Sequence, residues 1–134
     1  MVMKMKQTKR LIEICFLAQT FCEVPNFELT NNEMKVLFFV EQYSCVSPQV
    51  LISKLGLAKS NLALLTKKLV SLELIQSQPS IIDKRAVSFT ITQKGKNVVK
   101  NFVDTIAKSI RQEDLSQNFS DGLDSIAMFL NKKV

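Results

Sequence analysis

The sequence contains no histidine and no tryptophan, and only three glycines, three prolines and three cysteines in 134 residues. Without histidine it cannot form the Ser–His or Cys–His pairs of nucleophilic catalysis, and its acidic residues show no spacing typical of a general acid and base. We therefore expect a protein that is not an enzyme. The scarcity of glycine and proline excludes a glycine-rich phosphate loop and a long flexible linker, and it predicts a mainly helical chain.

The cysteines, Cys15, Cys22 and Cys45, show no CxxC spacing, and there is no histidine to complete a zinc site. The sequence thus predicts no structural metal and no cofactor. No apolar run approaches the roughly 18 residues needed to cross a bilayer, and no small-residue cleavage site follows the basic N-terminal segment. We expect a cytoplasmic protein with reduced thiols and no membrane partner.

Basic charge gathers in one part of the sequence. Residues 50–100 hold nine lysines and arginines and two acidic residues, a net charge of +7, whereas the whole chain carries +6, so the remainder carries −1. Such segregation is typical of a face that binds phosphates, because clustered cations release the counterions of a polyanion. A solvated lysine-rich face is the alternative.

Apolar spacing predicts helices at both ends of the chain. Residues at intervals of three and four predict a first helix over 6–22 and a long helix after Thr92, which acts as its N-cap. Ser120 or Asp121 is expected to open a last helix.

Local signals predict three helices between residues 30 and 72. Thr30 and Glu33 form a capping box that starts the first helix. Ser47 before a proline is an N-cap signature for the second helix, which Gly56 ends. Leucines at 62, 65, 69 and 72 predict a third helix with a polar, basic outer side. The inward-facing residues expected in the second helix are Val50, Leu51 and Leu55.

Two short helices joined by a tight turn have the proportions of a helix-turn-helix. Strand-forming residues follow at 74–75 and 86–91, separated by a turn over 79–84, and they predict a hairpin with a charged tip. The sequence therefore predicts a helix-turn-helix followed by a hairpin.

This order of elements, and two stretches of sequence, resemble the MarR family of winged helix-turn-helix regulators. ISKLGLAKS at 52–60 is similar to the family's "LAxxLgxsks" approach to the recognition helix. DKRA at 83–86 followed by ITQKG at 91–95 is similar to its "DxRa…LTxxG" wing. An arginine frequent in the family's recognition helix aligns with Leu64, so base preferences cannot be transferred to this chain.

The resemblance implies a mainly α fold with a small β-hairpin wing and a single domain over 1–134. Within it, residues 30–96 would form the winged helix-turn-helix, and helices in 1–25 and 97–134 would hold a homodimer. The implied function is transcriptional regulation, by family habit as a repressor, through binding of double-stranded DNA at a pseudo-palindromic operator. Family members often release DNA when a small-molecule inducer binds, but no residue here identifies an inducer, and neither the operator nor the target genes can be derived from the sequence.

DNA contacts are expected at the recognition helix and at the wing. Free N–H groups and the helix dipole favour a phosphate or base acceptor at the helix start. The expected DNA-binding residues are Lys59, Ser60, Asn61, Ala63, Lys67, Lys68, Lys84 and Arg85. Asn61 suits an adenine edge, Ala63 a thymine methyl, and Lys67 and Lys68 suit phosphates. Ser60 could instead be only an N-cap.

At the wing, Asp83 is expected to pair with Arg85 and hold its guanidinium for a narrow A·T-rich minor groove. An ordinary surface ion pair is the alternative.

Two other functions stay open. A branch of the family senses organic peroxides through a cysteine in the first helix, which makes Cys15 a redox candidate, although a helix cysteine is usually a small apolar residue. Winged helices also serve as protein-interaction modules, and an exposed Leu64 on the recognition face would favour that role.

Overall fold

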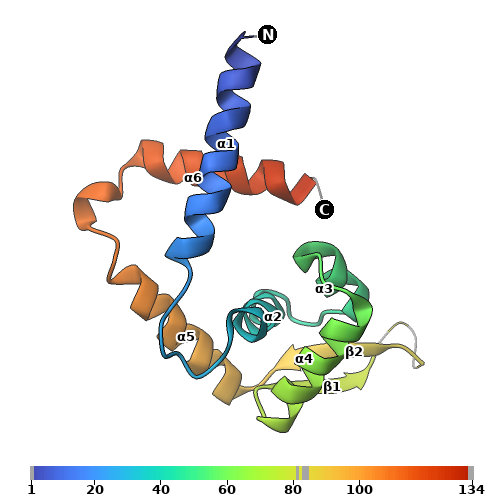
Figure 1. Ribbon diagram of the computed structural model, residues 1–134. Coiled ribbons are helices and arrows are strands. Elements are labelled where there is room, and N and C mark those ends of the chain that lie inside the picture. Colours follow the sequence, from blue (N-terminus) through green and yellow to red (C-terminus); the bar gives the residue numbers. More distant parts are fainter. Residues whose placement is uncertain (1, 81, 83–84, 133–134) are drawn as a thin grey trace.

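The computed structural model describes residues 2–80, 82 and 85–132. Its elements, in chain order, are α1 (Val2–Phe21), α2 (Asn31–Gln42), α3 (Pro48–Leu55), α4 (Lys59–Ser71), β1 (Ile75–Pro79), β2 (Val87–Ile91), α5 (Gln93–Ala107), a 3-10 turn (Gln112–Asp114) and α6 (Gln117–Lys132). In Figure 1, α2, α3, α4 and the hairpin gather into one body, from which α5 leads away towards α1 and α6. The expected fold class, mainly α with a small β-hairpin, is confirmed.

The helix boundaries follow local capping signals. The backbone N–H of Glu33 donates to Thr30 Oγ1 (3.3 Å), and the Thr30 N–H donates to Glu33 Oε1 (2.9 Å), which completes the predicted capping box of α2. Ser47 caps α3, and Gly56 ends it in the left-handed conformation at φ 64°. Thr92 caps α5 as expected. Short-range sequence signals therefore place the start of each of these helices.

The start predicted for the last helix was wrong. α6 begins at Gln117 rather than at Ser120 or Asp121. The reason is that Ser116 acts as its cap, because the backbone N–H of Phe119 donates to Ser116 Oγ (3.1 Å).

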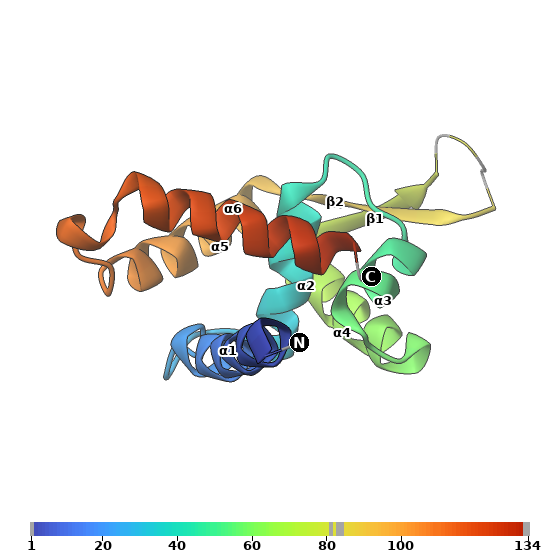
Figure 2. The same ribbon diagram turned by 90° about the horizontal axis from the view of Figure 1, so that it is seen from above.

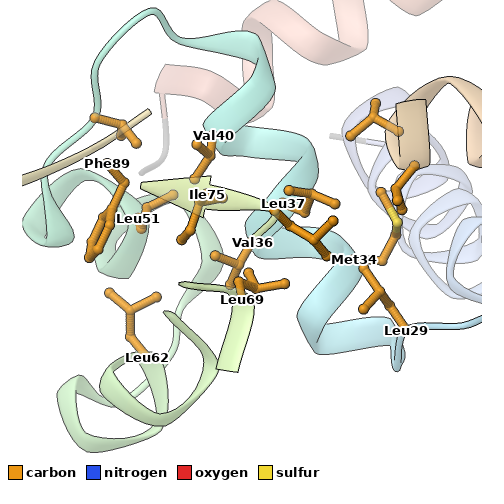
Figure 3. Close-up of a cluster of buried hydrophobic side chains, with 14 residues drawn as sticks. Leu29, Met34, Val36, Leu37, Val40, Leu51, Leu62, Leu69, Ile75 and Phe89 are labelled. Atoms are coloured by element: carbon orange, nitrogen blue, oxygen red, sulfur yellow. The ribbon is translucent and has the colours of Figure 1, made fainter. Parts of the chain in front are cut away.

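The core lies between α2, α3, α4, the hairpin and the first turns of α5. Figure 3 shows its side chains converging on α2. The largest fully buried ones are Leu37, Leu51, Leu69, Ile75, Val36 and Val40. Val50, expected to face inward, is instead 37% exposed. It lies beside Gln49, Ser53 and Lys54 in a shallow hollow on the outer side of α3, because Leu51 takes the inward position.

The hairpin is attached to the body at its base. β1 and β2 pair antiparallel in the register Ile75↔Ile91 to Pro79↔Val87. An isolated bridge joins Val46, in the loop before α3, to Phe89: the Phe89 N–H donates to the Val46 carbonyl (2.8 Å) and the reverse bond measures 3.1 Å. Part of the hairpin tip, with Asp83 and Lys84, lies outside the described residues.

α1, the second half of α5, and α6 leave much apolar surface uncovered. α1 and α6 contain no buried residue. α1 and α6 overlap in the view of Figure 1, but Figure 2 shows that they lie apart. Exposed apolar side chains on these helices include Phe16, Leu17, Phe21, Val103, Phe119, Leu123 and Met128. Among the described residues, no helix is long and apolar enough to span a membrane.

Candidate nucleic-acid interface

α4 packs on the core with one side and leaves the other to solvent. Leu62, Thr66 and Leu69 are its buried residues, and Figure 3 shows Leu62 and Leu69 on the inner side of the helix. The Thr66 hydroxyl donates to the Leu62 carbonyl (3.0 Å), so this inward polar group is satisfied. The exposed residues of α4 are Lys59, Ser60, Asn61, Ala63, Leu64, Lys67, Lys68, Val70 and Ser71. The helix itself contains no acidic residue.

The first turn of α4 has no side-chain cap. Its N-cap is Ala58, whose methyl group offers no hydrogen-bond acceptor. Ser60 lies inside the helix, so the alternative that Ser60 is the N-cap was wrong. Lys59, Ser60 and Asn61 are all exposed in this turn. Uncapped N–H groups next to an exposed lysine form an electropositive end that suits an anionic oxygen.

Lys68 is tied to α2. Its Nζ lies 2.6 Å from Glu33 Oε2, while the other oxygen of that carboxylate accepts the Thr30 N–H. The Glu33 side chain is only 6% exposed, against 53% for Lys68. Burial would raise the pKa of Glu33, but the hydrogen bonds from Lys68 and Thr30 and the charge of Lys68 together hold that pKa below its ordinary value. The bridge therefore joins the start of α2 to the recognition-like helix, a link that sequence reasoning missed.

Lys67 differs from its neighbour. It is exposed, and neither Lys67 nor Lys59 forms an ion pair with any described residue. Among the other cations counted in the basic segment, Lys94 donates to the Leu72 carbonyl (3.0 Å) and Lys54 donates to Asn131 Oδ1 (2.8 Å). Among the described residues of the basic segment, Lys54, Lys68 and Lys94 thus have intramolecular partners, whereas Lys59 and Lys67 form no ion pair.

Other candidate residues lie apart from α4. Arg85 is exposed, just before β2, on the same hairpin whose tip carries Asp83 and Lys84 outside the described residues. Cys15 is half-buried on α1 and is not in a disulfide. Among the described residues, no group of histidine, cysteine or acidic side chains could hold a metal ion.

Residues 29–87 match the MarR family model. No match was found among the curated proteins.

Solved structures share the fold over nearly the whole chain. A cysteine-to-serine mutant of MarR from E. coli, complexed with operator DNA, is 19% identical, with 95% of each chain covered and a TM-score of 0.64. The transcriptional regulator Tm0710 from Thermotoga maritima is 24% identical, covering 96% of this chain and 93% of that one, with a TM-score of 0.65. The transcriptional regulator BldR from Sulfolobus solfataricus is 16% identical, covering 96% and 95%, with a TM-score of 0.74.

The family match spans α2 to the first residue of β2, which includes α3, α4 and β1. The fold match extends to the flanking helices α1, α5 and α6. The MarR resemblance drawn from the sequence motifs is thereby confirmed for residues 29–87, and the chain as a whole shares the fold of these solved structures.

Proposed function

We propose that this chain is a sequence-specific DNA-binding transcriptional regulator that acts as a homodimer on a pseudo-palindromic operator. One observation carries the proposal: the outward side of α4 bears lysines and no acidic residue, on a fold shared with a MarR protein complexed with operator DNA. A helix of this kind fits the major groove, where lysines at its edges meet the two phosphate backbones. Occupation of a promoter by such a dimer would repress transcription.

The start of α4 supplies the polar contacts. Lys59 and Ser60, next to uncapped N–H groups, bind phosphate oxygens, and Asn61 binds an adenine edge. Ala63, also exposed, approaches a base methyl group. Lys67, with no ion pair among the described residues, binds a phosphate further along the helix.

Lys68 contributes differently from Lys67. Because its ammonium group is 2.6 Å from the buried Glu33 carboxylate, its charge is already compensated within the chain. Its principal effect is then to hold α4 against α2, with a weaker contribution to phosphate binding than a free lysine makes.

The wing supplies minor-groove contacts in this proposal. Arg85 enters the groove, Asp83 orients its guanidinium, and Lys84 binds a flanking phosphate. The attachment of β2 to Val46 supports this role, because it fixes where the hairpin leaves the body.

Dimer formation is proposed through residues 1–25 and 97–134, outside the winged helix-turn-helix of residues 30–96. Support comes from the exposed apolar side chains of α1, the second half of α5, and α6. A single chain leaves these in water, and a second copy would cover them. Light scattering at micromolar concentration should give twice the 15.2 kDa chain mass. A stable, cooperatively unfolding monomer would contradict the dimer.

The proposed regulator would respond to one of two inputs, a small molecule or an oxidant. A small-molecule inducer is suggested by family habit alone. Redox sensing through Cys15 has in its favour that the residue is an unbridged cysteine on a helix proposed for the dimer. Loss of DNA binding on organic peroxide treatment, abolished by Cys15→Ser, would support it.

The direct test is a binding selection from fragments of the source genome, followed by anisotropy titrations on selected and scrambled duplexes. We expect tighter binding to the selected sites and a steep loss of affinity with salt. Absence of binding to any duplex would leave the protein-interaction function in its place, which the exposed Leu64 favours.

A further inference from the structure

We infer that Leu64 is a specificity-determining residue, and that it binds the C5-methyl group of a thymine in the major groove. This inference rests on the proposed function, since it assigns a contact within the same DNA interface. The DNA-binding residues expected from the sequence do not include Leu64, which stands where the family frequently has an arginine.

Leu64 lies at the middle of the outward stripe of α4. Ser60, Leu64, Lys67 and Ser71 follow each other at intervals of four, three and four, so they fall within roughly 60° of one another around the helix. All four are exposed. A helix laid in a groove inserts the centre of its outward stripe most deeply. Any duplex that α4 enters must therefore meet Leu64.

The exposure of Leu64 is unusual within the winged-helix part. It is 70% exposed, whereas Val70 and Leu72 on and beside the same helix are 38% and 37% exposed. Among the described residues of 30–96, Ile82 in the hairpin is the other large apolar side chain that is more than half exposed. Leu64 therefore adds little to the core of its own chain and is available for a partner.

The chemistry of the stripe identifies that partner as duplex DNA rather than a protein. Lys59 and Lys67 stand on either side of Leu64 along the helix, without an ion pair to any described residue, and α4 contains no acidic residue. An apolar contact flanked by unpaired cations fits a polyanion whose grooves also contain apolar groups. In unmodified DNA the major groove contains one such group, the thymine C5-methyl.

Leu64 would also disfavour binding to sites that have guanine or cytosine at this position. Its side chain has no donor or acceptor, so a guanine or cytosine edge placed against it would lose water without gaining a hydrogen bond. Discrimination thus has an attractive part, the methyl contact, and a repulsive part, the unsatisfied polar edge. Burying one methyl group corresponds to roughly a fourfold change in affinity. We expect about this factor from the methyl contact in each half-site.

The test combines a protein change with a DNA change that removes only the methyl group. A duplex selected by the full chain from a random pool is resynthesised with deoxyuridine in place of each thymine in turn. Wild-type protein and Leu64→Ala are titrated against each duplex at one salt concentration. Alanine is a strong helix former and position 64 is solvent-exposed, so the variant keeps its fold, which thermal unfolding verifies.

We expect one thymine in each half-site at which uracil weakens wild-type binding about fourfold and leaves Leu64→Ala unaffected, so that the two changes are coupled. Lys67→Ala is the matched control: titrated in addition over a series of salt concentrations, it should lose affinity with a shallower salt dependence than the wild type while keeping the full sensitivity to uracil. Equal uracil effects in wild type and Leu64→Ala, or no sensitive thymine at all, would overturn this inference and leave DNA binding intact. Absence of any duplex binding by the wild type would instead overturn the proposed function, and this inference with it.

Discussion

Replacing Gly95 with alanine should destabilise the chain, although alanine is the better helix former. Gly95 is buried in the first turn of α5. A Cβ atom there would stand 2.7 Å from Ile91 Cγ1 and 3.1 Å from the Leu74 carbonyl carbon, and closer still to the Leu74 carbonyl oxygen. Ile91 could rotate away. The Leu74 carbonyl cannot, because it accepts the Thr92 N–H (3.1 Å) and the Thr92 hydroxyl (3.0 Å).

The expected magnitude is a balance of two terms. Because the clash is with a fixed backbone group, the overpacking cost should lie at the upper end of the usual range, about 3 kcal/mol, and the helix propensity of alanine offsets about 1 kcal/mol of that. A net loss near 2 kcal/mol would lower the Tm by roughly 8 °C for a chain of this size. Thermal unfolding should be compared at one protein concentration, because the proposed dimer makes Tm concentration-dependent.

The two other glycines are matched controls. Within one chain no atom lies within 4 Å of a Cβ at Gly122, so Gly122→Ala in α6 should stabilise the unassembled chain by about 0.5–1 kcal/mol. A Cβ at Gly56 would likewise meet no atom within 4 Å, but Gly56 has a φ of 64°. Gly56→Ala should therefore lower the free energy of unfolding by about 1 kcal/mol through backbone strain alone. If Gly95→Ala proves as stable as the wild type, the close approach of α5 to Leu74 is not as described.

Three further predictions concern charge. The lowered pKa of Glu33 means that its ion pair stabilises the folded chain above its ordinary value of 4.5 and that this contribution is lost as pH falls further. Glu33→Gln should therefore lower the free energy of unfolding at pH 7 by about 1–3 kcal/mol. Between pH 5 and 3 the free energy of unfolding of this variant, measured by chemical denaturation, should fall less than that of the wild type. Lys67→Ala should reduce the slope of log affinity against log salt by about one unit. Lys68→Ala should reduce that slope by clearly less, and Lys68→Arg should restore the affinity of the wild type. Equal slopes for Lys67→Ala and Lys68→Ala would contradict the pairing of Lys68 with Glu33. Finally, with no histidine present, DNA affinity from pH 6 to 7.5 should be nearly constant, and a tenfold change that survives replacement of the cysteines by serine would refute this.

The sequence was informative wherever a structural feature depends on neighbours within a few residues. The caps at Thr30, Ser47 and Thr92 and the left-handed Gly56 each involve atoms within four residues of one another, so their signals could be interpreted without a fold. The α6 boundary was missed even so, because Ser116 precedes a stretch with few apolar residues.

Features that join distant segments left no such signal. Lys68 and Glu33 are 35 positions apart, and nothing in either local sequence distinguishes Lys68 from Lys67 beside it. The constraint at Gly95 likewise comes from the Leu74 carbonyl in the segment before β1, although the motif resemblance did point to a glycine at that position. Leu64 could be assigned to the outward side of its helix from spacing, but its flanking by unpaired lysines required the structure.

The bridge between Val46 and Phe89 has a mechanical consequence. Two backbone hydrogen bonds lock the hairpin to the loop that precedes α3, so the distance between the wing and α4 is set within the chain. In each copy α4 and the wing would then bind a half-site as one rigid unit, at a fixed separation from each other. Adaptation to operators of different half-site spacing would have to occur between the two rigid units, by bending or rotation at α5. Figure 2 shows α5 leading away from the winged part on the side opposite the wing.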